Sequence, residues 1–375
     1  MIQIPRFNFK RVLVVITLVV WLQMLYSVSL KYQMVVSLVE KMPRSIDSHY
    51  DEPFIVLRSN GDFESFRIER QTPRKVVLPD KARQDAGKTV LILCILHGDH
   101  SFGSGRNFSS FLQMIAAFEY PMYQLSLGFL MSDYEDLQSS IPILDQFVRD
   151  NNLAAGAIYL QPQEETSSRE MRQRDDIQRE RRSLLAQLRN RLLLSTLRHE
   201  DAVLWIDSDI VEIQSDALKQ FVRSGLDIVT PFCRFGTKGM ESYDGNAWVG
   251  RRKRPSEEQW KQIKEGTTSD FVPNGDGAEM VVHWIDKDDK VVELDSVGGT
   301  VLYVRADVHR NGVNFPPFYL IGSDWDAKYG GYDGIETEGL CYIARTIGYR
   351  CWAMPHITVS HTYWQETPKH PRKSD

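Results

Sequence analysis

Apolar runs alternate with segments of helical apolar spacing in the first half of the globular part of the chain. The runs at 89–96 and 123–131 are almost entirely apolar, which is typical of strands buried on both faces. The segments 107–119 and 134–150 carry apolar residues at helical spacing, and a short apolar run follows at 154–159. This alternation predicts an α/β fold with a mostly parallel sheet.

The second half continues the pattern with shorter elements. An arginine-rich segment at 165–200 has leucines at helical spacing in its C-terminal half. We expect helices at 211–222 and 336–344, strands at 203–206, 227–231, 295–304 and 356–361, and a hairpin formed by 281–285 and 291–294. Residues 233–275 are rich in glycine, arginine and polar residues, so we expect them to line a functional site rather than the core.

One uncharged apolar run lies near the N-terminus, at 12–30. At about 1.5 Å per residue, a helix of this length spans roughly 28 Å, which is enough for a thin bilayer. Arg6, Lys10 and Arg11 precede the run, so the positive-inside rule favours a cytoplasmic N-terminus and a single-pass type II anchor. The alternative is a cleaved signal peptide, but the run is long for one and no small-residue cleavage site ends it.

The chain therefore divides into five predicted parts. These are a cytoplasmic tail at 1–11, the transmembrane anchor at 12–30, a stem at 31–87, a lumenal globular domain at 88–365 and a C-terminal tail at 366–375. The stem has several prolines, mixed charges and few long apolar runs. The globular part is long enough to bury a full core as one domain.

The composition of the chain says less about the fold than the apolar pattern does. The formal net charge of −5 gives no reason to expect a nucleic-acid partner. Among the four cysteines, Cys94 lies in an apolar run and is expected to be a buried thiol. Cys341 and Cys351 could pair, but their spacing alone does not show it. Asn107 begins the one N-glycosylation sequon, which a lumenal domain could use.

The most informative motif is the run from Val203 to Asp209, where an apolar strand leads directly into Asp207 and Asp209. Side chains two residues apart share a face if the strand continues, so both carboxylates could reach one ligand at its end. Carboxylates this close repel each other unless a cation lies between them. A hard ion such as Mn²⁺ or Mg²⁺ would fit there and would hold a diphosphate. Many glycosyltransferases carry this motif, although Asp-x-Asp also arises by chance in loops.

The arginines that precede this motif are candidates for phosphate binding. A nucleoside diphosphate needs cations, and guanidinium groups bind phosphate in a fork. Among the arginines of this segment, we select Arg181, Arg182 and Arg189 as candidates. The alternative for each of them is a solvated helix face.

Four further residues stand where strands end or are interrupted. His97 ends the first apolar run and opens a loop. Gly298 and Gly299 would let the backbone approach a ligand closely, or they form a bulge. His361 ends the last expected strand, where a metal ligand can return to the site, although a lone histidine is usually structural.

Taken in order, these segments resemble the fungal Golgi mannosyltransferases of the mannan-polymerase family, the Anp1/Van1 type of glycosyltransferase family 62. The resemblance covers roughly residues 88–365, and its strength lies in seven motifs that occur in the same order. They are Tyr120-Pro121 with 125–133; Arg181-Arg182 with Arg189-Asn190 and 192–194; 205–210; Tyr243-Asp244 with Asn246 and Trp248; Asp295 with Val297, Gly298 and Gly299; Gly312-Val313 with Phe315-Pro316; and 336–339 with Pro355-His356 and His361.

The resemblance implies a GT-A fold, GDP-mannose as donor, Mn²⁺ as cofactor and a retaining transfer that makes an α-mannosidic bond. The acceptor would be a mannan or N-glycan outer chain. The protein would work with other mannosyltransferase subunits on the Golgi membrane, with its catalytic domain in the lumen.

The same resemblance assigns roles to individual residues. Asp209 and His361 are expected to bind the metal, and Asp207 to bridge the metal and the nucleotide. The residues expected around the donor are His97, Arg181, Arg189, Asn190, Asp207, Gly298 and Gly299. Those expected to take part in catalysis are Asp207, Asp209, Arg181 and Asp244, the last near the transferring sugar or the acceptor hydroxyl.

Two other functions are open on the sequence. A scaffold subunit would keep the fold, bind nucleotide weakly and position an active partner, but intact Asp207, Asp209 and His361 argue against it. The second is a membrane-anchored metal-dependent hydrolase or a carbohydrate-binding module. A hydrolase would be expected to cluster several histidines, and the nine histidines of this chain do not cluster. A carbohydrate-binding module would not need the arginine-rich helix.

Overall fold

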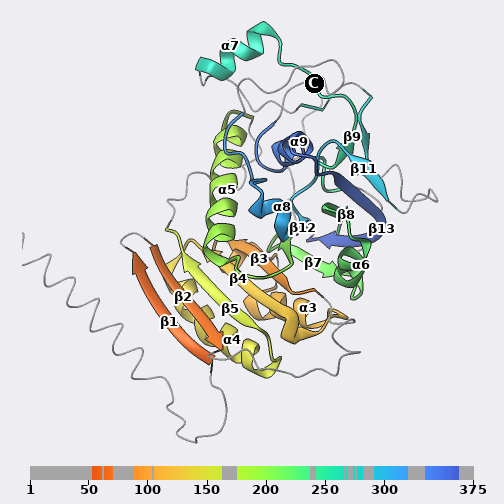
Figure 1. Ribbon diagram of the computed structural model, residues 1–375. Helices are drawn as coiled ribbons and strands as arrows, with labels where there is room; N and C mark the ends of the chain where they lie inside the picture. Colours follow the sequence, from red (N-terminus) through yellow and green to blue (C-terminus); the bar gives the residue numbers. More distant parts are fainter. Residues whose placement is uncertain are drawn as a thin grey trace, which may run out of the picture. The chain divides into compact units, whose positions relative to one another are not determined.

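The computed structural model describes residues 53–60, 63–70, 88–103, 105–162, 175–236, 242–265, 267, 273–274, 277–281, 291–319 and 334–362 (Figure 1). The predicted cytoplasmic tail, anchor and C-terminal tail lie outside these ranges. Within them, no helix has both the length and the apolarity needed to cross a membrane.

One mixed sheet organises this part of the chain, with strands in the order β1-β2-β5-β4-β3-β6-β12-β8-β13-β11 and with β7 paired to β13 (Figure 1). The strands are β1 Pro53–Asn60, β2 Phe63–Arg70, β3 Val90–Leu96, β4 Leu125–Met131, β5 Ala155–Leu160, β6 Ala202–Ile206, β7 Ile210–Ile213, β8 Ile228–Phe235, β11 Val292–Leu294, β12 Val301–Arg305 and β13 Cys351–His361. Strands β5, β4, β3 and β6 run parallel, and β12 is antiparallel to both β6 and β8. The predicted α/β fold is confirmed, and its sheet is parallel at the centre with antiparallel strands around it.

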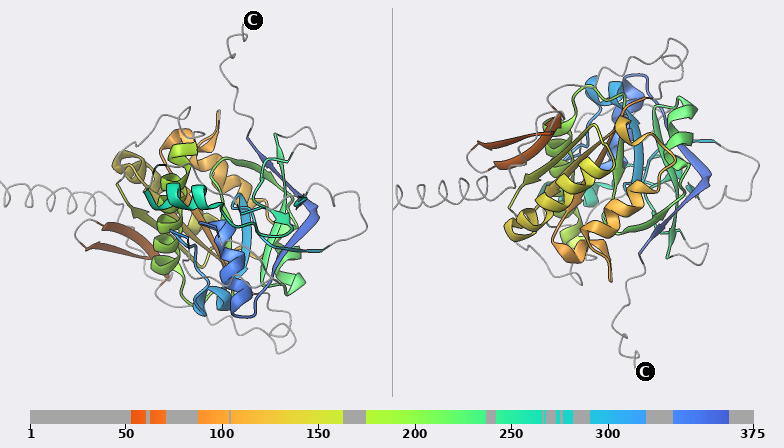
Figure 2. Two further views of the ribbon diagram at one scale, coloured as in Figure 1. Left: turned by 90° about the horizontal axis from the view of Figure 1, so that it is seen from above. Right: turned by 90° about the horizontal axis from the view of Figure 1, so that it is seen from below.

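Helices cover both sides of the sheet. They are α3 Phe108–Ala116, α4 Tyr134–Asp150, α5 Asp175–Thr196, α6 Ala217–Ser224, α7 Glu257–Glu265, α8 Ala306–Arg310 and α9 Thr337–Thr346. Figure 2 shows α3 and α4 in front of the sheet from one side, and α5 and α7 from the other. The side chains of Asn107 and Asp133 accept hydrogen bonds from the first turns of α3 and α4, which explains where these helices begin.

The core follows the apolar runs. Every residue of β4 is buried, as are all but one of β3, so the expectation of strands buried on both faces is confirmed. The residues of β6 and Val301–Val304 of β12 are buried as well. The two strands pair from Val301 opposite Ile206 to Arg305 opposite Ala202. The two carboxylates of the acidic motif therefore emerge directly from the centre of a rigid sheet.

The predicted helix at 211–222 is wrong in its first half. Residues Ile210–Ile213 form β7 instead, and α6 begins only at Ala217. Ile210 and Ile213 are buried because β7 pairs with the end of β13, so tertiary pairing overrides the local helical pattern.

Three further predictions concern strands. Strand β11 pairs with β13, and the hairpin predicted between it and 281–285 lies outside the described residues apart from Val281. The strand predicted at 295–304 begins only at Val301, because its glycine-containing first half forms a loop. Strands β1 and β2 fall in the segment predicted as a stem, and β2 pairs antiparallel with β5.

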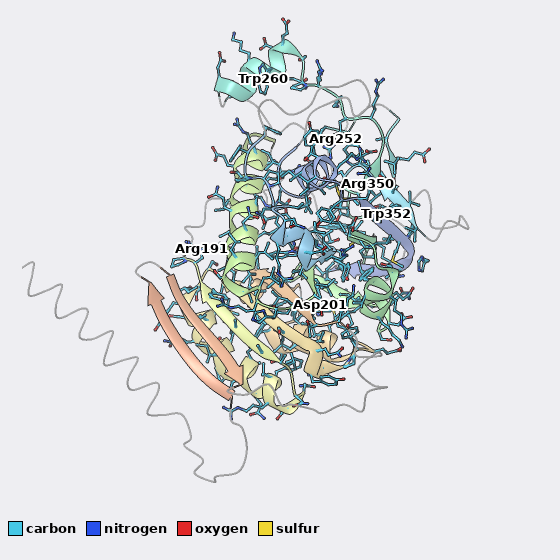
Figure 3. All side chains as sticks on the ribbon, viewed as in Figure 1. Arg191, Asp201, Arg252, Trp260, Arg350 and Trp352 are labelled. Atoms are coloured by element: carbon cyan, nitrogen blue, oxygen red, sulfur yellow. A yellow bond between two sulfur atoms is a disulfide. The ribbon has the colours of Figure 1, made fainter. Side chains whose placement is uncertain are left out.

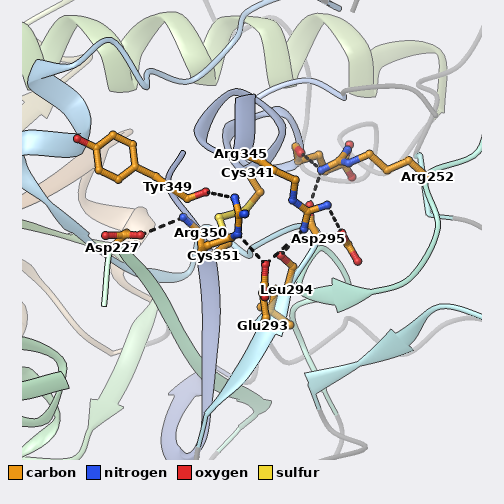
Figure 4. Close-up of a disulfide and its surroundings, with 11 residues drawn as sticks. Asp227, Arg252, Glu293, Leu294, Asp295, Cys341, Arg345, Tyr349, Arg350 and Cys351 are labelled. Atoms are coloured by element: carbon orange, nitrogen blue, oxygen red, sulfur yellow. Dashed lines mark hydrogen bonds and ion pairs between the residues drawn. A yellow bond between two sulfur atoms is a disulfide. The ribbon is translucent and has the colours of Figure 1, made fainter. Parts of the chain in front are cut away.

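A disulfide joins Cys341 in α9 to Cys351 at the start of β13 (Figure 4). The charged side chains beside it connect the same elements to β11 and the loop after it. Arg345 pairs with Asp295 at 2.6 Å, and Arg350 pairs with Glu293 at 3.2 Å. The possible pairing of the two cysteines is thus present, and Cys94 is a buried free thiol as expected.

Candidate active site at the end of strand β6

The acidic motif forms a turn after β6 and does not continue the strand. The backbone N–H of Asp207 donates to the carbonyl of Thr300 at 2.8 Å. The hydroxyl of Ser208 donates to the carbonyl of Ser101 at 3.0 Å and is nearly buried. Because the backbone turns here, the side chains of Asp207 and Asp209 do not share one face of a strand. Each of them contacts a different partner.

Asp209 faces His361, which lies at the end of β13. The His361 Nε2 atom is 2.9 Å from Asp209 Oδ2, while Nδ1 is 2.8 Å from the carbonyl oxygen of Thr362. A carbonyl only accepts, so Nδ1 carries the ring hydrogen, and Nε2 of the neutral ring has a lone pair directed at a carboxylate. Two acceptors this close need a cation or a second proton between them.

The surroundings hold the His361 ring in place. Tyr243 stacks on it with ring centroids 3.5 Å apart, and the ring itself is buried. The side chain of Asp209 is 25% exposed, so one side of the pair is open to a ligand. Among the described residues, no three His, Cys, Asp or Glu side chains form a ready cation cage. An ion held by this pair would need oxygen ligands from elsewhere, such as a diphosphate or water.

Asp207 faces a buried arginine. Arg189 Nη2 lies 3.0 Å from Asp207 Oδ1, and Arg189 Nε lies 2.8 Å from Glu336 Oε1. The guanidinium carbon is 5.2 Å from the centre of the Trp205 ring and 5.4 Å from that of Phe315. Arg189 is therefore held by ion pairs with two carboxylates and lies against two aromatic rings.

The electrostatics of the turn reflect this crowding. Although 41% of the Asp207 side chain is exposed, desolvation by the packed surroundings raises the pKa of its carboxyl to about 7, an effect that Arg189 opposes and that Asp209 increases. Burial likewise raises the pKa of the Asp244 carboxyl, although hydrogen bonds from Asn246 and Thr300 act in the other direction. Negative charge is thus concentrated at the site beyond what Arg189 neutralises.

The paired glycines make room for these charged side chains. A Cβ atom at Gly298 would lie 1.6 Å from Asp244 Oδ2, and one at Gly299 would lie 2.8 Å from Arg189 Nη2. The close approach that we expected between this backbone and a ligand is, in the structure, an approach to the site's own side chains.

Gly298→Ala should therefore displace Asp244. Overpacking of this kind costs about 1–3 kcal/mol, measurable as a fall in the free energy of unfolding in urea. Gly245→Ala is the matched control, because a Cβ at Gly245 meets no atom within 4 Å and its effect should stay within about 0.5 kcal/mol. Equal stability of the two variants would contradict the contact.

The structure does not bring every predicted residue to this site. Arg181 is exposed on α5 and contacts Gln178 at 3.4 Å, whereas Arg182 pairs with the buried Glu338 at 2.7 Å. On the outer side of the same helix, Arg191 points away from the sheet (Figure 3). Of the selected arginines, Arg189 is the one in contact with the acidic motif.

Asn190 and His97 also have protein partners. Asn190 Nδ2 donates to the carbonyl of Phe315 at 2.6 Å, and its Oδ1 accepts from the Phe315 N–H at 2.9 Å. Asn190 thereby places the aromatic ring beside Arg189. His97 Nδ1 lies 2.7 Å from the hydroxyl of Ser132, at the ends of the neighbouring strands β3 and β4.

Glu336 is the site residue that sequence reasoning missed. Its position before α9 suits the helix dipole, which favours acids there, so a structural role is enough to account for it in the sequence. Tyr243 belonged to a motif of the resemblance, but nothing in the sequence indicated that it stacks on His361.

Comparisons with known proteins show the family of the chain. The family described as Anp1 matches residues 75–319. The mannan polymerase complex subunit mnn9 of Schizosaccharomyces pombe is 29% identical over 68% of this chain and 77% of its own length. The corresponding subunit MNN9 of Candida albicans is 33% identical over 49% of this chain, which spans about half of that relative.

Among solved structures, a mannosyltransferase of Pyrobaculum calidifontis in complex with GDP-Man and Mn²⁺ is similar to 78% of this chain and 60% of its own. The identity is 14% and the TM-score is 0.39, so this likeness does not bear on the function of the chain.

Proposed function

The chain belongs to the Anp1 family and is a glycosyltransferase, and we propose that it transfers mannose from GDP-mannose to a mannan or N-glycan outer chain. The transfer retains the configuration of the sugar and depends on Mn²⁺. The observation that carries the proposal is the contact between Asp209 and His361, in which Nε2 and Oδ2 lie 2.9 Å apart and the Asp209 side chain is 25% exposed toward a ligand.

Asp209 and His361 would hold the ion, and Asp207 would stand between it and the nucleotide. When bound, Mn²⁺ would hold the diphosphate and stabilise the negative charge that develops as GDP departs. The hydrogen bond from Nδ1 to the Thr362 carbonyl fixes the tautomer in which Nε2 can bind a cation. The stacked ring of Tyr243 keeps the imidazole in that orientation.

The remaining charged groups have separate roles in this proposal. Arg189 lies behind Asp207 and limits the repulsion among the carboxylates of the turn. Arg181 does not touch the acidic motif, and its proposed contact is with the part of the diphosphate or donor sugar that would extend along the exposed side of α5. Asp244, held by Thr300 and Asn246, lies near the transferring sugar or the acceptor hydroxyl.

We also propose where and with what the protein works. The relatives named above are subunits of mannan polymerase complexes, so we expect further mannosyltransferase subunits as partners. The apolar run at 12–30 supports a single-pass type II anchor in the Golgi membrane, with the catalytic domain in the lumen.

Calorimetric titration of the full-length chain with GDP-mannose, with and without Mn²⁺, tests the donor site. We expect binding that needs both the guanine nucleotide and the metal, and much weaker binding of GDP-glucose and UDP-sugars. Binding of no sugar nucleotide would favour the alternative of a scaffold subunit. Release of mannose from mannan without GDP-mannose would favour a hydrolase.

Arg181→Ala should weaken GDP-mannose binding about tenfold or more, the loss expected for one hydrogen bond to a charged group. The midpoint of thermal unfolding should hardly change, because Arg181 is exposed. Arg191→Ala, on the outer side of the same helix, is the control and should bind normally. A large loss of stability with normal binding would give Arg181 a structural role instead.

A further inference from the structure

We propose that Glu336 is a positioning residue, which acts through Arg189 on Asp207 and on which binding of Mn²⁺ and GDP depends. The inference rests on the proposed function. Glu336 itself does not face the open side of the site, because it is only 6% exposed.

The first argument is the connection between three charged groups. Glu336 binds Nε of Arg189, and Asp207 binds Nη2, so the two carboxylates hold different nitrogens of one guanidinium group. Glu336 and Arg189 are buried, whereas the side chain of Asp207 is 41% exposed. Only the Asp207 end of this connection can meet a ligand.

The second argument is that Arg189 is enclosed. The rings of Trp205 and Phe315 lie 5.2 and 5.4 Å from its guanidinium carbon and contact each other edge to face, with centroids 5.3 Å apart, so together they close one side of the group. The Gly299 carbonyl accepts from Nη2 at 3.2 Å. The other charged contacts are with Asp207 and Glu336, so Glu336 helps to set the position of the Arg189 fork relative to Asp207.

The backbone of Glu336 gives a third, independent argument. Its φ of 60° and ψ of −126° lie in a region that residues other than glycine rarely adopt. It occupies the N-cap position of α9, yet its side chain makes no capping hydrogen bond. A glycine would relieve the backbone and an aspartate or serine would cap the helix, so the glutamate side chain is kept for its contact with Arg189.

The chemical consequence concerns competition for Asp207. With Glu336 in place, the positive charge of Arg189 is shared between two carboxylates. Without the charge of Glu336, Arg189 would be drawn toward Asp207 and would compete with a cation for that carboxylate. Residues that orient metal ligands from behind typically change metal affinity or activity by about 10–100-fold when they are lost.

Glu336→Gln tests this in the full-length chain, because glutamine keeps the shape of the side chain and removes its charge. Mn²⁺ binding is measured from the EPR signal of the free ion, with and without GDP. We expect the Mn²⁺ dissociation constant in the presence of GDP to rise about 10–100-fold. An unchanged dissociation constant in the folded variant would overturn the inference.

Asp227→Asn is the matched control. It also breaks a partly buried ion pair, with Arg305 at 2.9 Å, but at the end of β12 opposite to the site. Its Mn²⁺ affinity should equal that of the wild type. A similar loss of Mn²⁺ affinity in this variant would mean that removing any ion pair destabilises the fold and thereby weakens the site. That result would overturn the inference.

Gly299→Ala provides a second route should Glu336→Gln not fold. Its Cβ would press on Arg189 Nη2 and move the fork without changing any charge, so Mn²⁺ affinity should fall here too. The Mn²⁺ affinity of the double variant should fall no further than that of the single variant with the lower affinity, because both substitutions act through Arg189. Additive losses would overturn the inference. If the wild type binds no Mn²⁺ with GDP, the proposed function itself fails.

Discussion

Replacing Asp209 with alanine is expected to abolish Mn²⁺-dependent binding of GDP while the chain stays folded. Without this carboxylate, His361 Nε2 faces no charged partner, and the pair that would hold the cation is gone. The fold should survive because Asp209 lies in a turn after β6 and its side chain is partly exposed. Calorimetry with GDP and Mn²⁺ measures the loss, and circular dichroism shows whether the fold remains.

Asp145→Ala is the control for this variant. The Asp145 side chain is 23% exposed, compared with 25% for Asp209, and it also has one charged partner, Arg149 on α4. Its removal should leave GDP binding and its dependence on Mn²⁺ unchanged. Wild-type affinity for GDP in the Asp209 variant would refute the metal assignment.

Arg189→Ala should cause the largest loss of stability among the site variants. Removing this buried guanidinium leaves Glu336 buried without its partner, takes a counter-charge from Asp207 and leaves a cavity beside two aromatic rings. Breaking a buried pair by deleting one partner costs roughly 3–5 kcal/mol, and the exposure of Asp207 favours the lower end of that range. Urea unfolding followed by tryptophan fluorescence measures it.

The comparison for this prediction is Arg149→Ala on α4. Arg149 is exposed and pairs with Asp145 at 3.0 Å within one helix, so its loss should cost at most about 1 kcal/mol. If the Arg189 variant is as stable as this control, the contacts of the Arg189 side chain do not stabilise the fold. The burial of Arg189 would then need another explanation.

The sequence predicted the elements whose signal is local. The apolar runs of β3 and β4 identify buried strands because nothing polar interrupts them, and Asp207 and Asp209 stand out because they end such a strand. The partners of the two carboxylates could not be predicted in the same way. They come from α5, from the residue before α9 and from the end of β13, and only the folded sheet brings these together.

Errors arose where pairing decides the structure. The apolar residues of 211–222 fit a helix, yet β7 finds a partner in β13 that no local pattern indicates. The pairing of β11 with β13 likewise has no signal in the local pattern. Arg181 and Arg189 looked alike as arginines before the acidic motif, but helix geometry places one outside and the other in the core.

The bond between Cys341 and Cys351 decides how this protein has to be prepared. It ties α9, the helix that begins immediately after Glu336, to β13, the strand that ends in His361. In the chain-entropy account of disulfides, a bond that closes so short a loop stabilises the folded state by about 3 kcal/mol. A chain made in a reducing cytosol, or stored with a thiol reagent, would lack that restraint on two elements that carry the site. Expression in an oxidising compartment and buffers free of reductant are therefore part of every measurement described above.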